Sequence, residues 1–555
     1  MASIGRREFL KLCAGSAPAA IGLAGPAARF ANAQPAHRTP ASMERYIDPL
    51  PIAKKLRPVE MHEGTEFYCV RMIEFPHAFH SQLPPARVWG YEGQYPGPAL
   101  EAFRGRPIEV RWENQLPAQH LFGIDPHIHG AKPPSPAVRT VPHLHGARTP
   151  SASDGLPEKW FTPGAAAHYL YPNEQQAATL WYHDHALGIA RLNVYAGLAG
   201  FYLLRDEEER NMNLPAGDYE IPLIVQDRNL DDNGQLVYAP TFDDGTAPAP
   251  GGWAPEFLGE LPVVNGALYP YLEVEPRPYR LRILNSSNAR FFNLYLNLAA
   301  RPTDIPEVVT FQQIGTDGGF LSRPAPVRLL LLAPGERADV IVDFSAQQGK
   351  NITLANNAPA PYPGWDFSIA HHAQLYELMQ FRVTRPLAKS TGAVFLPPSS
   401  SFRRVDPSAP VAVTRDFVLT EAMDTQGHSL GARINGKGYD QPVTEKPRLG
   451  TLEKWRFINT TEDAHPMHLH LVQFQILERQ GFDATAFLHG RVQLVGISRP
   501  PAAHEAGWKD TAVVNPREVL SILVRFEGYI GRYAFHCHML EYEDNDMMRP
   551  YDVIA

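Results

Sequence analysis

Short segments in which apolar and polar residues alternate recur along the whole chain. In "IEVRW" (108–112) and in "LRILN" (281–285) the pattern is close to a period of two, which is the period of a strand with one buried face. Comparable runs, separated by turns rich in Pro, Gly and Asp, are "GLAGFYLLRD", "RADVIVDFS", "ITLANN", "EKWRFINTT" and "EVLSILVRFEG". The clearest helical candidate is the short segment "RDEEERNMN" (205–213). The pattern predicts an all-β protein built from sandwich or barrel domains.

The 555 residues are too many for one compact core, so several domains are expected. The charged segment 205–213 follows a strand and suits a domain junction. Residues 386–410 are rich in Pro and Ser and lack periodicity, which favours a linker. These breaks predict domains over 45–205, 214–385 and 411–555.

The N-terminus contains "RREFLK" (6–11), then a weakly apolar run rich in Ala and Gly, then "ANAQ" (31–34). This order resembles a twin-arginine export signal over residues 1–33, and the alternative is a disordered basic tail. We expect recognition by the twin-arginine export machinery and a periplasmic or extracellular location. No later stretch is apolar for the roughly 20 residues of a membrane span. The net charge of −8 argues against nucleic acid as a partner.

Histidine pairs are the strongest chemical signal in the chain. They occur in "HLHG" (143–146), "WYHDH" (181–185), "HPMHLH" (465–470) and "HCH" (536–538). Residues two apart on a strand face the same way, so each His-x-His presents two imidazoles from one rigid surface. The pairs are His143 with His145, His183 with His185, His468 with His470, and His536 with His538.

The residues between these histidines predict a second site. Cys537 must face away from both of its histidine neighbours, and His465, three residues before His468, must face away from that pair. A thiolate, an imidazole and a weak thioether, which Met547 could supply, form the ligand set of an electron-transfer copper centre. Eight histidines without a carboxylate suit several copper ions that bind and reduce dioxygen. The sequence thus implies two metal sites back to back.

Coincidence and zinc account less well for the histidines. A lone His-x-His is poor support for a metal site, and we interpret His127 and His129 in "DPHIHG" as a loop decoy. Zinc rarely needs more than four ligands, so a site for zinc alone would not use eight histidines. Four pairs in one chain indicate a cluster of several ions.

The four motifs, in this order, resemble those of the multicopper oxidases, and most closely the group of bacterial spore-coat laccases, bilirubin oxidase and phenoxazinone synthase. Further matching segments are "HLHGARTPSASDGLPEKWF", "LWYHDHALGIARLNVYAGLAGFYLLRD", "IGTDGGFLSRP", "LLLAPGERADVIVDF" and "HCHMLEYEDNDMMRP". The resemblance implies three cupredoxin-like Greek-key β-barrel domains and up to four copper ions per chain. It also implies a type 1 copper in the third domain and a trinuclear cluster shared between the first and third domains.

The resemblance also implies roles for individual residues. The type 2 copper would be held by His143 and His468. The type 3 pair would be held by the other six: His145, His183, His185, His470, His536 and His538. The type 1 copper would be held by His465, Cys537 and Met547. Asp154 and Glu543 match family acids that deliver protons to oxygen, and the alternative is that they are turn acids that cap a loop.

The function implied is that of an exported laccase-like oxidase. A donor gives single electrons to the type 1 copper, and Cys537 passes them through its histidine neighbours. Four electrons and four protons then convert dioxygen to two waters. The 11 methionines form no cluster, so we expect a small phenolic or other aromatic donor rather than a cuprous ion. The alternative is a periplasmic scaffold or copper binder without oxidase activity, but a scaffold has no chemical need for the eight histidines.

Tyr542 departs from the family pattern, which places the second type 1 imidazole five residues after the cysteine. A tyrosine must lose a proton with a reference pKa of about 10 before it can bind as a phenolate. It can therefore either bind as an anion, which favours the oxidised metal, or turn away and leave three ligands. Both alternatives predict weak or absent blue absorption and poor oxidation of phenols, beside a cluster that still loads copper.

Overall fold

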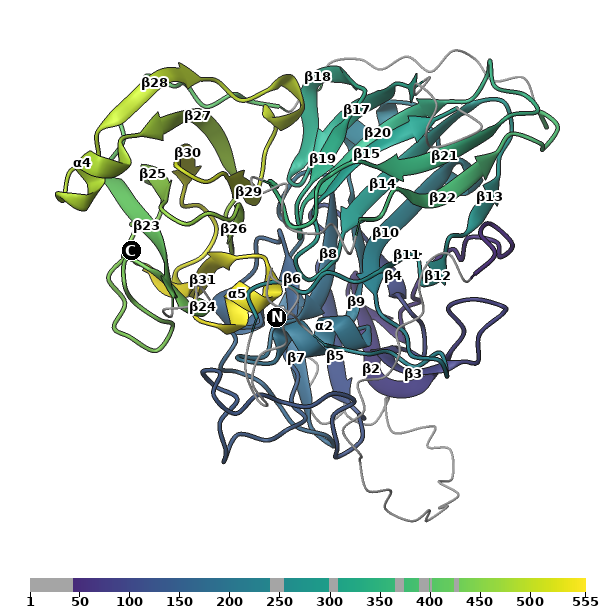
Figure 1. Ribbon diagram of the computed structural model, residues 1–555, viewed down its shortest axis with the longest axis horizontal. Coiled ribbons are helices and arrows are strands. Elements are labelled where there is room, and N and C mark those ends of the chain that lie inside the picture. Colours follow the sequence, from purple (N-terminus) through teal and green to yellow (C-terminus); the bar gives the residue numbers. More distant parts are fainter. Residues whose placement is uncertain are drawn as a thin grey trace.

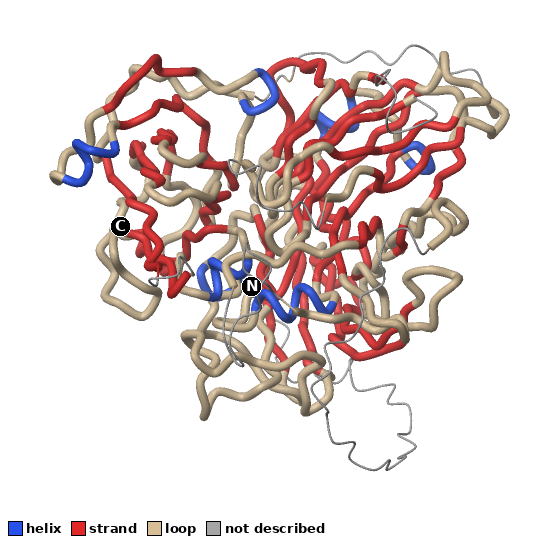
Figure 2. Tube along the Cα trace, viewed as in Figure 1, coloured by secondary structure: helices blue, strands red, loops and turns tan. Residues whose placement is uncertain are grey.

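Strands dominate the computed structural model (Figure 2). It describes residues 43–239, 254–298, 308–364, 374–388, 399, 402–423 and 429–555. The predicted export signal, 1–33, lies outside the described residues. Within them, no helix is both long enough and apolar enough to cross a membrane. The prediction of an all-β protein is confirmed.

The strands of the first predicted domain form two sheets. The five-stranded sheet contains β1 (Glu60–His62), β2 (Thr65–His77), β5 (Ile108–Asn114) and β7 (Ala166–Tyr171), with β3 (Ala86–Tyr91) paired to β2. The four-stranded sheet has the order β4 (Gly97–Phe103), β9 (Ala199–Arg205), β8 (Ala178–Asp184) and β6 (Pro142–His145).

The middle domain also has two sheets, which lie at the upper right of Figure 1. The seven-stranded sheet has the order β12 (Ala267–Leu268), β11 (Leu261–Val264), β10 (Glu220–Arg228), β14 (Pro278–Asn285), β20 (Arg337–Asp343), β17 (Phe311–Thr316) and β18 (Gly319–Val327). The six-stranded sheet contains β13 (Tyr271–Glu273), β22 (Glu377–Arg382), β21 (Asn351–Asn356), β15 (Phe292–Asn297) and β16 (Val308–Val309), with β19 (Leu330–Leu332) paired to β15.

The third domain, green to yellow in Figure 1, repeats this arrangement. Its six-stranded sheet has the order β24 (Ser429–Ile434), β23 (Thr414–Met423), β25 (Leu452–Asn459), β30 (Glu518–Arg525), β27 (Phe474–Phe482) and β28 (Leu494–Arg499). Its four-stranded sheet has the order β29 (Thr511–Val514), β26 (His465–Leu469), β31 (Gly531–Cys537) and β32 (Met548–Val553).

The helices within the described residues are short. They are α2 (Ala190–Ala196), α3 (Glu207–Asn211), α4 (Ala484–Leu488), α5 (Leu540–Asp544) and the 3-10 turns Ser151–Ser153, Gly217–Tyr219 and Ala503–Glu505. α3 is the helix predicted within 205–213, and the carboxylate of Asp206 caps it by accepting from Glu209 N. Such an N-cap satisfies one of the amide groups that the first turn leaves unbonded.

Each sheet takes its strands from one predicted domain only. The exact domain boundaries stay predictions, and part of the predicted linker, 386–410, lies outside the described residues. All seven runs predicted as strands form strands. In β5 the alternate residues Ile108, Val110 and Trp112 are buried, as predicted, whereas β9, β14, β20 and β30 are buried along nearly their whole length.

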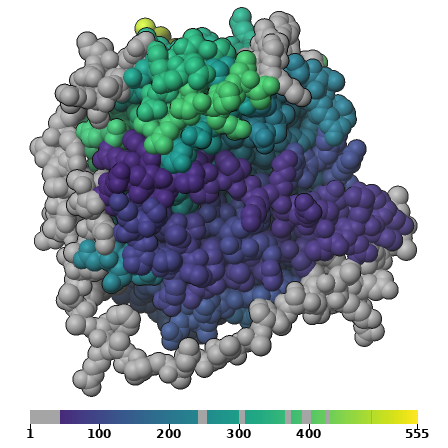
Figure 3. Space-filling model, turned by 90° about the vertical axis from the view of Figure 1, so that its right-hand side faces the viewer, coloured from purple at the N-terminus to yellow at the C-terminus, as the bar shows by residue number. Residues whose placement is uncertain are grey.

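A segment at the start of the described chain ties the first domain to the middle one. Tyr46 N donates to Tyr269 O at 2.9 Å, and Leu50 N donates to Tyr271 O at 2.7 Å. Figure 3 shows this purple segment lying across the boundary between the blue and the green parts of the surface. The domains are therefore held by the main chain as well as by side-chain packing.

Candidate metal centre

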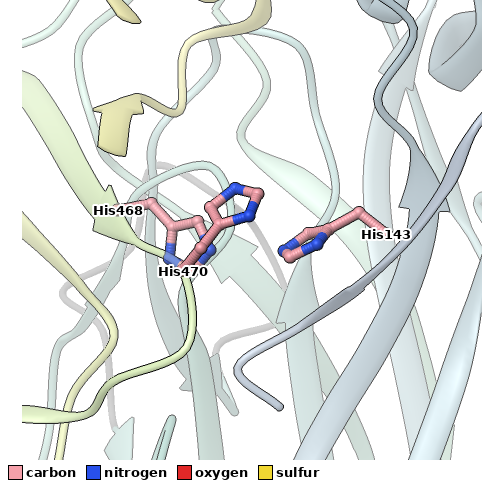
Figure 4. Close-up of side chains that lie close together, drawn as sticks. All are labelled: His143, His468 and His470. Atoms are coloured by element: carbon pink, nitrogen blue, oxygen red, sulfur yellow. The ribbon is translucent and has the colours of Figure 1, made fainter. Parts of the chain in front are cut away.

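Two pairs of antiparallel strands carry the histidines. His143 on β6 lies opposite His183 on β8, and His468 on β26 lies opposite His536 on β31. One pair belongs to the first domain and the other to the third, so the histidines meet across an interface. Figure 4 shows His143 facing His468 and His470 across this gap.

The structure brings all eight histidines together. Six of the rings form two triangles, one of His145, His183 and His538 and the other of His185, His470 and His536. The ring centroids are 5.7, 4.8 and 5.3 Å apart in the first triangle and 5.0, 4.8 and 5.3 Å apart in the second. The remaining rings, His143 and His468, are 5.8 Å apart. Closer contacts cross this division: His145 stacks on His468 at 3.6 Å and His143 on His470 at 3.8 Å. The sorting of the rings into type 3 and type 2 sets therefore stays a prediction.

Three of the rings have one nitrogen fixed and the other without a partner. The Nδ1 atoms of His143, His183 and His468 lie 2.5, 2.9 and 2.9 Å from backbone carbonyl oxygens. Their Nε2 atoms are buried and have no hydrogen-bond partner among the described residues. Leaving a polar atom buried and unbonded costs about 1–3 kcal/mol each. Several such atoms at one place indicate that a cation belongs between them.

His145 and His538 complete this set with different atoms. His145 points Nε2 at the Asp510 carboxylate, 2.9 Å away, and leaves Nδ1 without a partner within the described chain. His538 leaves both ring nitrogens buried and without a partner in the same described residues. An imidazole binds a metal through either nitrogen, so these atoms fit a metal site.

In the second triangle the nitrogens point at one another. The Nε2 atom of His536 lies 3.1 Å from Nε2 of His185 and 3.2 Å from Nε2 of His470. Nδ1 of His536 lies 2.9 Å from the carbonyl oxygen of Cys537, which can only accept, so the neutral ring carries its proton on Nδ1. Its Nε2 therefore has no proton and offers one lone pair to two neighbouring nitrogens. A metal ion between the three nitrogens would satisfy all of them.

Burial keeps seven of the cluster histidines neutral. It lowers the pKa well below the usual 6.5 for His143, His145, His183, His470 and His538. Burial also lowers the pKa of His185 to about 4 and that of His536 to about 3. Neutral imidazole is the form that binds metals, so these side chains are ready ligands at pH 7.

The two predicted acids both contact the cluster. Asp154 Oδ2 lies 2.8 Å from His470 Nδ1, and Glu543 Oε2 lies 3.1 Å from His536 Nδ1. Burial raises the pKa of Asp154 well above its usual value and that of Glu543 to about 7. Their side chains are therefore directed at histidines rather than at a surface loop. Their role as proton donors stays a prediction.

Sequence reasoning missed Asp510, Thr511 and Arg337. Asp510 is fully buried and contacts His145, and Thr511 Oγ1 lies 3.1 Å from the same His145 nitrogen. In the sequence, Asp510 stands between a lysine and a threonine just before an apolar strand, as an ordinary turn acid would. No local pattern distinguishes it, because the partners of its carboxylate, His145 and Arg337, lie 365 and 173 residues away in the chain.

Cys537 and His465 lie on the opposite face of the same strands. Cys537 Sγ is 3.5 Å from His465 Nδ1 and accepts from Met539 N at 3.4 Å. Both side chains are fully buried, and Met547 is buried in the same apolar cluster as Cys537. The thiol, the imidazole and the thioether are thus gathered behind the histidine cluster.

Tyr542 does not supply the missing imidazole, and its hydroxyl group is bound elsewhere. The phenol donates to Asp463 Oδ2 at 2.5 Å and lies 3.1 Å from Glu421 Oε1, while its ring packs edge-on against His465 at 4.8 Å. Burial and these two acids raise the pKa of Tyr542 well above 10. Among the described residues, no group of three His, Cys, Asp or Glu ligand atoms within 4.8 Å of one another includes Cys537.

The decoy histidines lie outside the cluster. His127 is exposed and pairs with Asp125 at 2.9 Å, and His129 Nδ1 lies 2.7 Å from Asp546 Oδ1. Both residues lie in turns between β5 and β6. Neither is placed to bind an ion with the eight clustered histidines.

Comparison with known proteins decides the family. Models of the multicopper oxidase family match residues 77–138, 138–209 and 406–554. The chain is 43% identical over 528 residues to a laccase of Bacillus stratosphericus, with 92% of this chain and 100% of the relative covered. It is 42% identical to a laccase of Bacillus subtilis, with 92% and 99% covered. The chain belongs to the multicopper oxidase family.

Solved structures of multicopper oxidases agree with this assignment. The McoA multicopper oxidase of Aquifex aeolicus superimposes with a TM-score of 0.70 at 28% identity, with 91% of this chain and all of that chain covered. A laccase of Pediococcus acidilactici gives 0.71 at 26% identity, with 95% and 97% covered. The prediction of cupredoxin-like domains is confirmed.

Membership makes copper the cofactor and makes this multicopper oxidase an oxidoreductase that uses oxygen. The unpartnered nitrogens of the histidine cluster fit copper. The second site fits less well, because only His465 and Cys537 present facing ligand atoms and Tyr542 is turned to carboxylates. The assignment of each side chain to a particular copper ion stays a prediction.

Proposed function

We propose that this multicopper oxidase is an exported laccase-like enzyme that takes single electrons from phenolic or other aromatic donors and is impaired at its type 1 copper by Tyr542. The observation that carries the proposal is the juxtaposition of two sites on one strand. His536 points into the histidine cluster, and Cys537, the next residue, points at His465 on the other side.

Bound copper would supply the redox chemistry that side chains lack. The chain provides the route and the protons. Cys537 is bonded covalently to both His536 and His538, so a short through-bond path joins the two sites. Asp154 and Glu543 hold protons at His470 and His536, beside the position where oxygen would be reduced.

Tyr542 weakens the type 1 site in this proposal. Its hydroxyl proton is held by Asp463, so phenolate binding would break a buried hydrogen bond. The thiolate, His465 and Met547 remain as a three-ligand site, which holds copper less firmly than four ligands would. We expect little blue absorption and slow oxidation of phenols.

An aromatic donor is favoured by the absence of a methionine cluster in the sequence and by the two Bacillus relatives, which are laccases. The deciding experiment counts copper per chain and records the visible spectrum and the dioxygen uptake of the same sample with a phenolic donor. Copper in the cluster, weak blue colour and slow uptake support the proposal. Intense blue colour with full copper contradicts impairment by Tyr542.

A second function is favoured by the same tyrosine. A chain whose electron entry site is incomplete can serve as a copper-binding protein or periplasmic scaffold without oxidase activity. The two functions differ in one measurement. If the copper-loaded protein consumes no dioxygen with any donor, including a strongly reducing one, the scaffold or copper-binding function replaces the oxidase.

Export rests on "RREFLK" ahead of a weakly apolar run. Changing Arg6 and Arg7 together to Lys should trap the precursor in the cytoplasm, as cell fractionation and immunoblotting would detect. Arg29→Lys, outside the pair, is the matched control and should be exported normally. Normal export of the double variant would refute the twin-arginine route.

A further inference from the structure

The middle domain supplies none of the eight histidines, yet its backbone reaches their cluster. All eight lie within 143–185 and 468–538. Gly335 of the middle domain has φ +84, and a Cβ there would lie 2.8 Å from Cγ of the His538 ring. The absence of a side chain at this position lets the middle domain pack directly on a cluster histidine.

Two residues further along, Arg337 joins the three domains. Its guanidinium is fully buried. Nε donates to the carbonyl oxygen of Thr179 in the first domain at 2.9 Å. Nη1 and Nη2 donate to the two carboxylate oxygens of Asp510 in the third domain at 2.7 and 2.5 Å. Two parallel hydrogen bonds of this kind, a fork, fix the orientation of the carboxylate relative to the guanidinium as well as their distance, because both groups are planar.

Asp510 contacts one cluster histidine of the first domain, His145, and one of the third domain, His468. Its Oδ1 lies 2.9 Å from His145 Nε2, and its backbone oxygen lies 2.9 Å from His468 Nδ1. The two rings stack 3.6 Å apart with 13° between their planes. The other nitrogen of each ring, Nδ1 of His145 and Nε2 of His468, is buried without a hydrogen-bond partner in the described chain. Asp510 therefore determines which nitrogen of each ring faces the metal.

The loop after His145 is shaped around the same ion pair. Gly146 has φ +84, and a Cβ there would lie 2.5 Å from Asp510 Oδ2 and 2.7 Å from Arg337 Nη2. A side chain at this position would push the carboxylate away from the histidine. Backbone of the first domain, at Gly146 and Thr179, therefore lies directly against the ion pair.

We propose that Arg337 and Asp510 are positioning residues. They set the ring orientation of His145 and His468, and the distance between the cluster histidines of the first domain and those of the third. The middle domain acts through this pair as the template on which the first and third domains assemble a copper site. The proposal rests on the copper binding assigned to the cluster and adds residues that bind no metal themselves. Carboxylates that orient metal-binding histidines typically contribute 10–100-fold to metal affinity.

A purely structural role for the pair is the alternative. The chain offers a matched control in Arg290 and Asp227, which are equally buried. Arg290 Nε donates to Asp227 Oδ2 at 2.9 Å, and Nη2 donates to Gly259 O at 2.8 Å. This pair contacts none of the eight histidines in any described hydrogen bond. Loss of the control pair should affect folding but not copper.

The experiment measures copper affinity of the full chain by competition with a chelator, together with thermal unfolding of the copper-free protein. The variants are Arg337→Lys, Asp510→Asn and Arg290→Lys. Lysine keeps the charge but cannot form the fork. We expect all three to unfold at lower temperature, and only Arg337→Lys and Asp510→Asn to lose about 10–100-fold in affinity for cluster copper. Unchanged copper affinity in both would overturn the proposal.

A milder variant keeps the proposal testable if Arg337→Lys and Asp510→Asn fail to fold. Thr511→Val keeps the side-chain shape and the Arg337–Asp510 fork. It removes a hydroxyl that donates to Asp510 Oδ1 at 3.0 Å and lies 3.1 Å from His145 Nε2 and 3.2 Å from His468 Nδ1. We expect it to fold and to lose several-fold in copper affinity, and wild-type affinity would count against the positioning role. Failure of the unmutated protein to bind copper would instead refute the proposed function, on which this inference depends.

Discussion

The two faces of β31 differ in how completely they are prepared for copper. On one face, eight imidazoles converge, and the second nitrogen of most of them is fixed by a carbonyl or a carboxylate. On the other face, Cys537 and His465 face each other, but the residue in the place of the second imidazole, Tyr542, is hydrogen-bonded to Asp463. One site is complete before the metal arrives, and the other is not.

This difference shows that the strand scaffold and the ligand set can be separated. The same backbone pairing of β26 with β31 supports both sites. The incomplete site therefore results from one side chain and its neighbours, not from a distorted fold. Substitutions on one face show whether the other face responds, and a substitution remote from both shows what the fold alone contributes.

The largest effect is expected from His468→Ala. The change removes a cluster nitrogen that has no partner within the described residues, so copper bound there should be lost while Cys537 and His465 stay in place. Dioxygen reduction should fall by about 10³-fold or more, equivalent to about 4 kcal/mol of activation free energy. Copper analysis and an oxygen electrode would measure both effects.

The decoy provides the control for that variant. His127→Ala changes an exposed histidine outside the cluster and should leave copper content and dioxygen uptake unchanged. Loss of copper from His127→Ala with normal copper in His143→Ala would show that the wrong His-x-His was assigned to the cluster.

Glu543→Gln should have the next largest effect. It keeps the shape of the side chain beside His536 but cannot give up a proton. Proton transfer by a placed side chain contributes about 10²–10⁴-fold, so we expect dioxygen reduction to fall by about 10²-fold with full copper. The exposed Glu527→Gln is the control. Equal rates in both variants would remove Glu543 from the proton path.

Tyr542→His should complete the ligand set on the face of β31 that carries Cys537. An imidazole at this position would supply the missing ligand, give an intense blue band and raise turnover of phenols by about tenfold, or about 1.4 kcal/mol. Tyr542→Phe removes the hydroxyl group without adding a ligand and should stay pale. If the unmutated protein is already deep blue, or if both variants behave alike, the comparison between the faces is mistaken.

The smallest effect on either face is expected from Glu209→Gln in the junction helix α3. Burial would raise the pKa of Glu209, but Arg282, Arg280 and Arg205 together lower it to about 2. A lowered pKa means that the ionised form stabilises the fold above about pH 4.5, and that this contribution is lost as the pH falls toward 2.

The shift in the Glu209 pKa corresponds to roughly 3 kcal/mol of stability at pH 7. Denaturant titrations at pH 7 and pH 3 should show that Glu209→Gln loses this amount at pH 7 and much less at pH 3. Copper content should not change. The exposed Glu207→Gln should unfold like the unmutated protein at both values.

Local patterns predicted the strands and the histidine pairs, because both depend on a period of two residues. The opposite placement of Cys537 and His465 follows from the same period. The contacts of Asp510 and Arg337 could not be predicted, because they join residues 365 and 173 positions apart in the chain. The direction of the Tyr542 hydroxyl also depended on partners elsewhere in the fold, namely Asp463 and Glu421.

The alternation of side chains between the two faces of β31 has a consequence for how such a protein evolves. A substitution on one face leaves the side chains of the other face where they were, so the site around Cys537 can be lost or altered while the histidine cluster stays whole. Insertion of a single residue has no such freedom, because it would turn His536 and Cys537 to each other's side at once. The strand allows the two sites to diverge by substitution and opposes any change in its length.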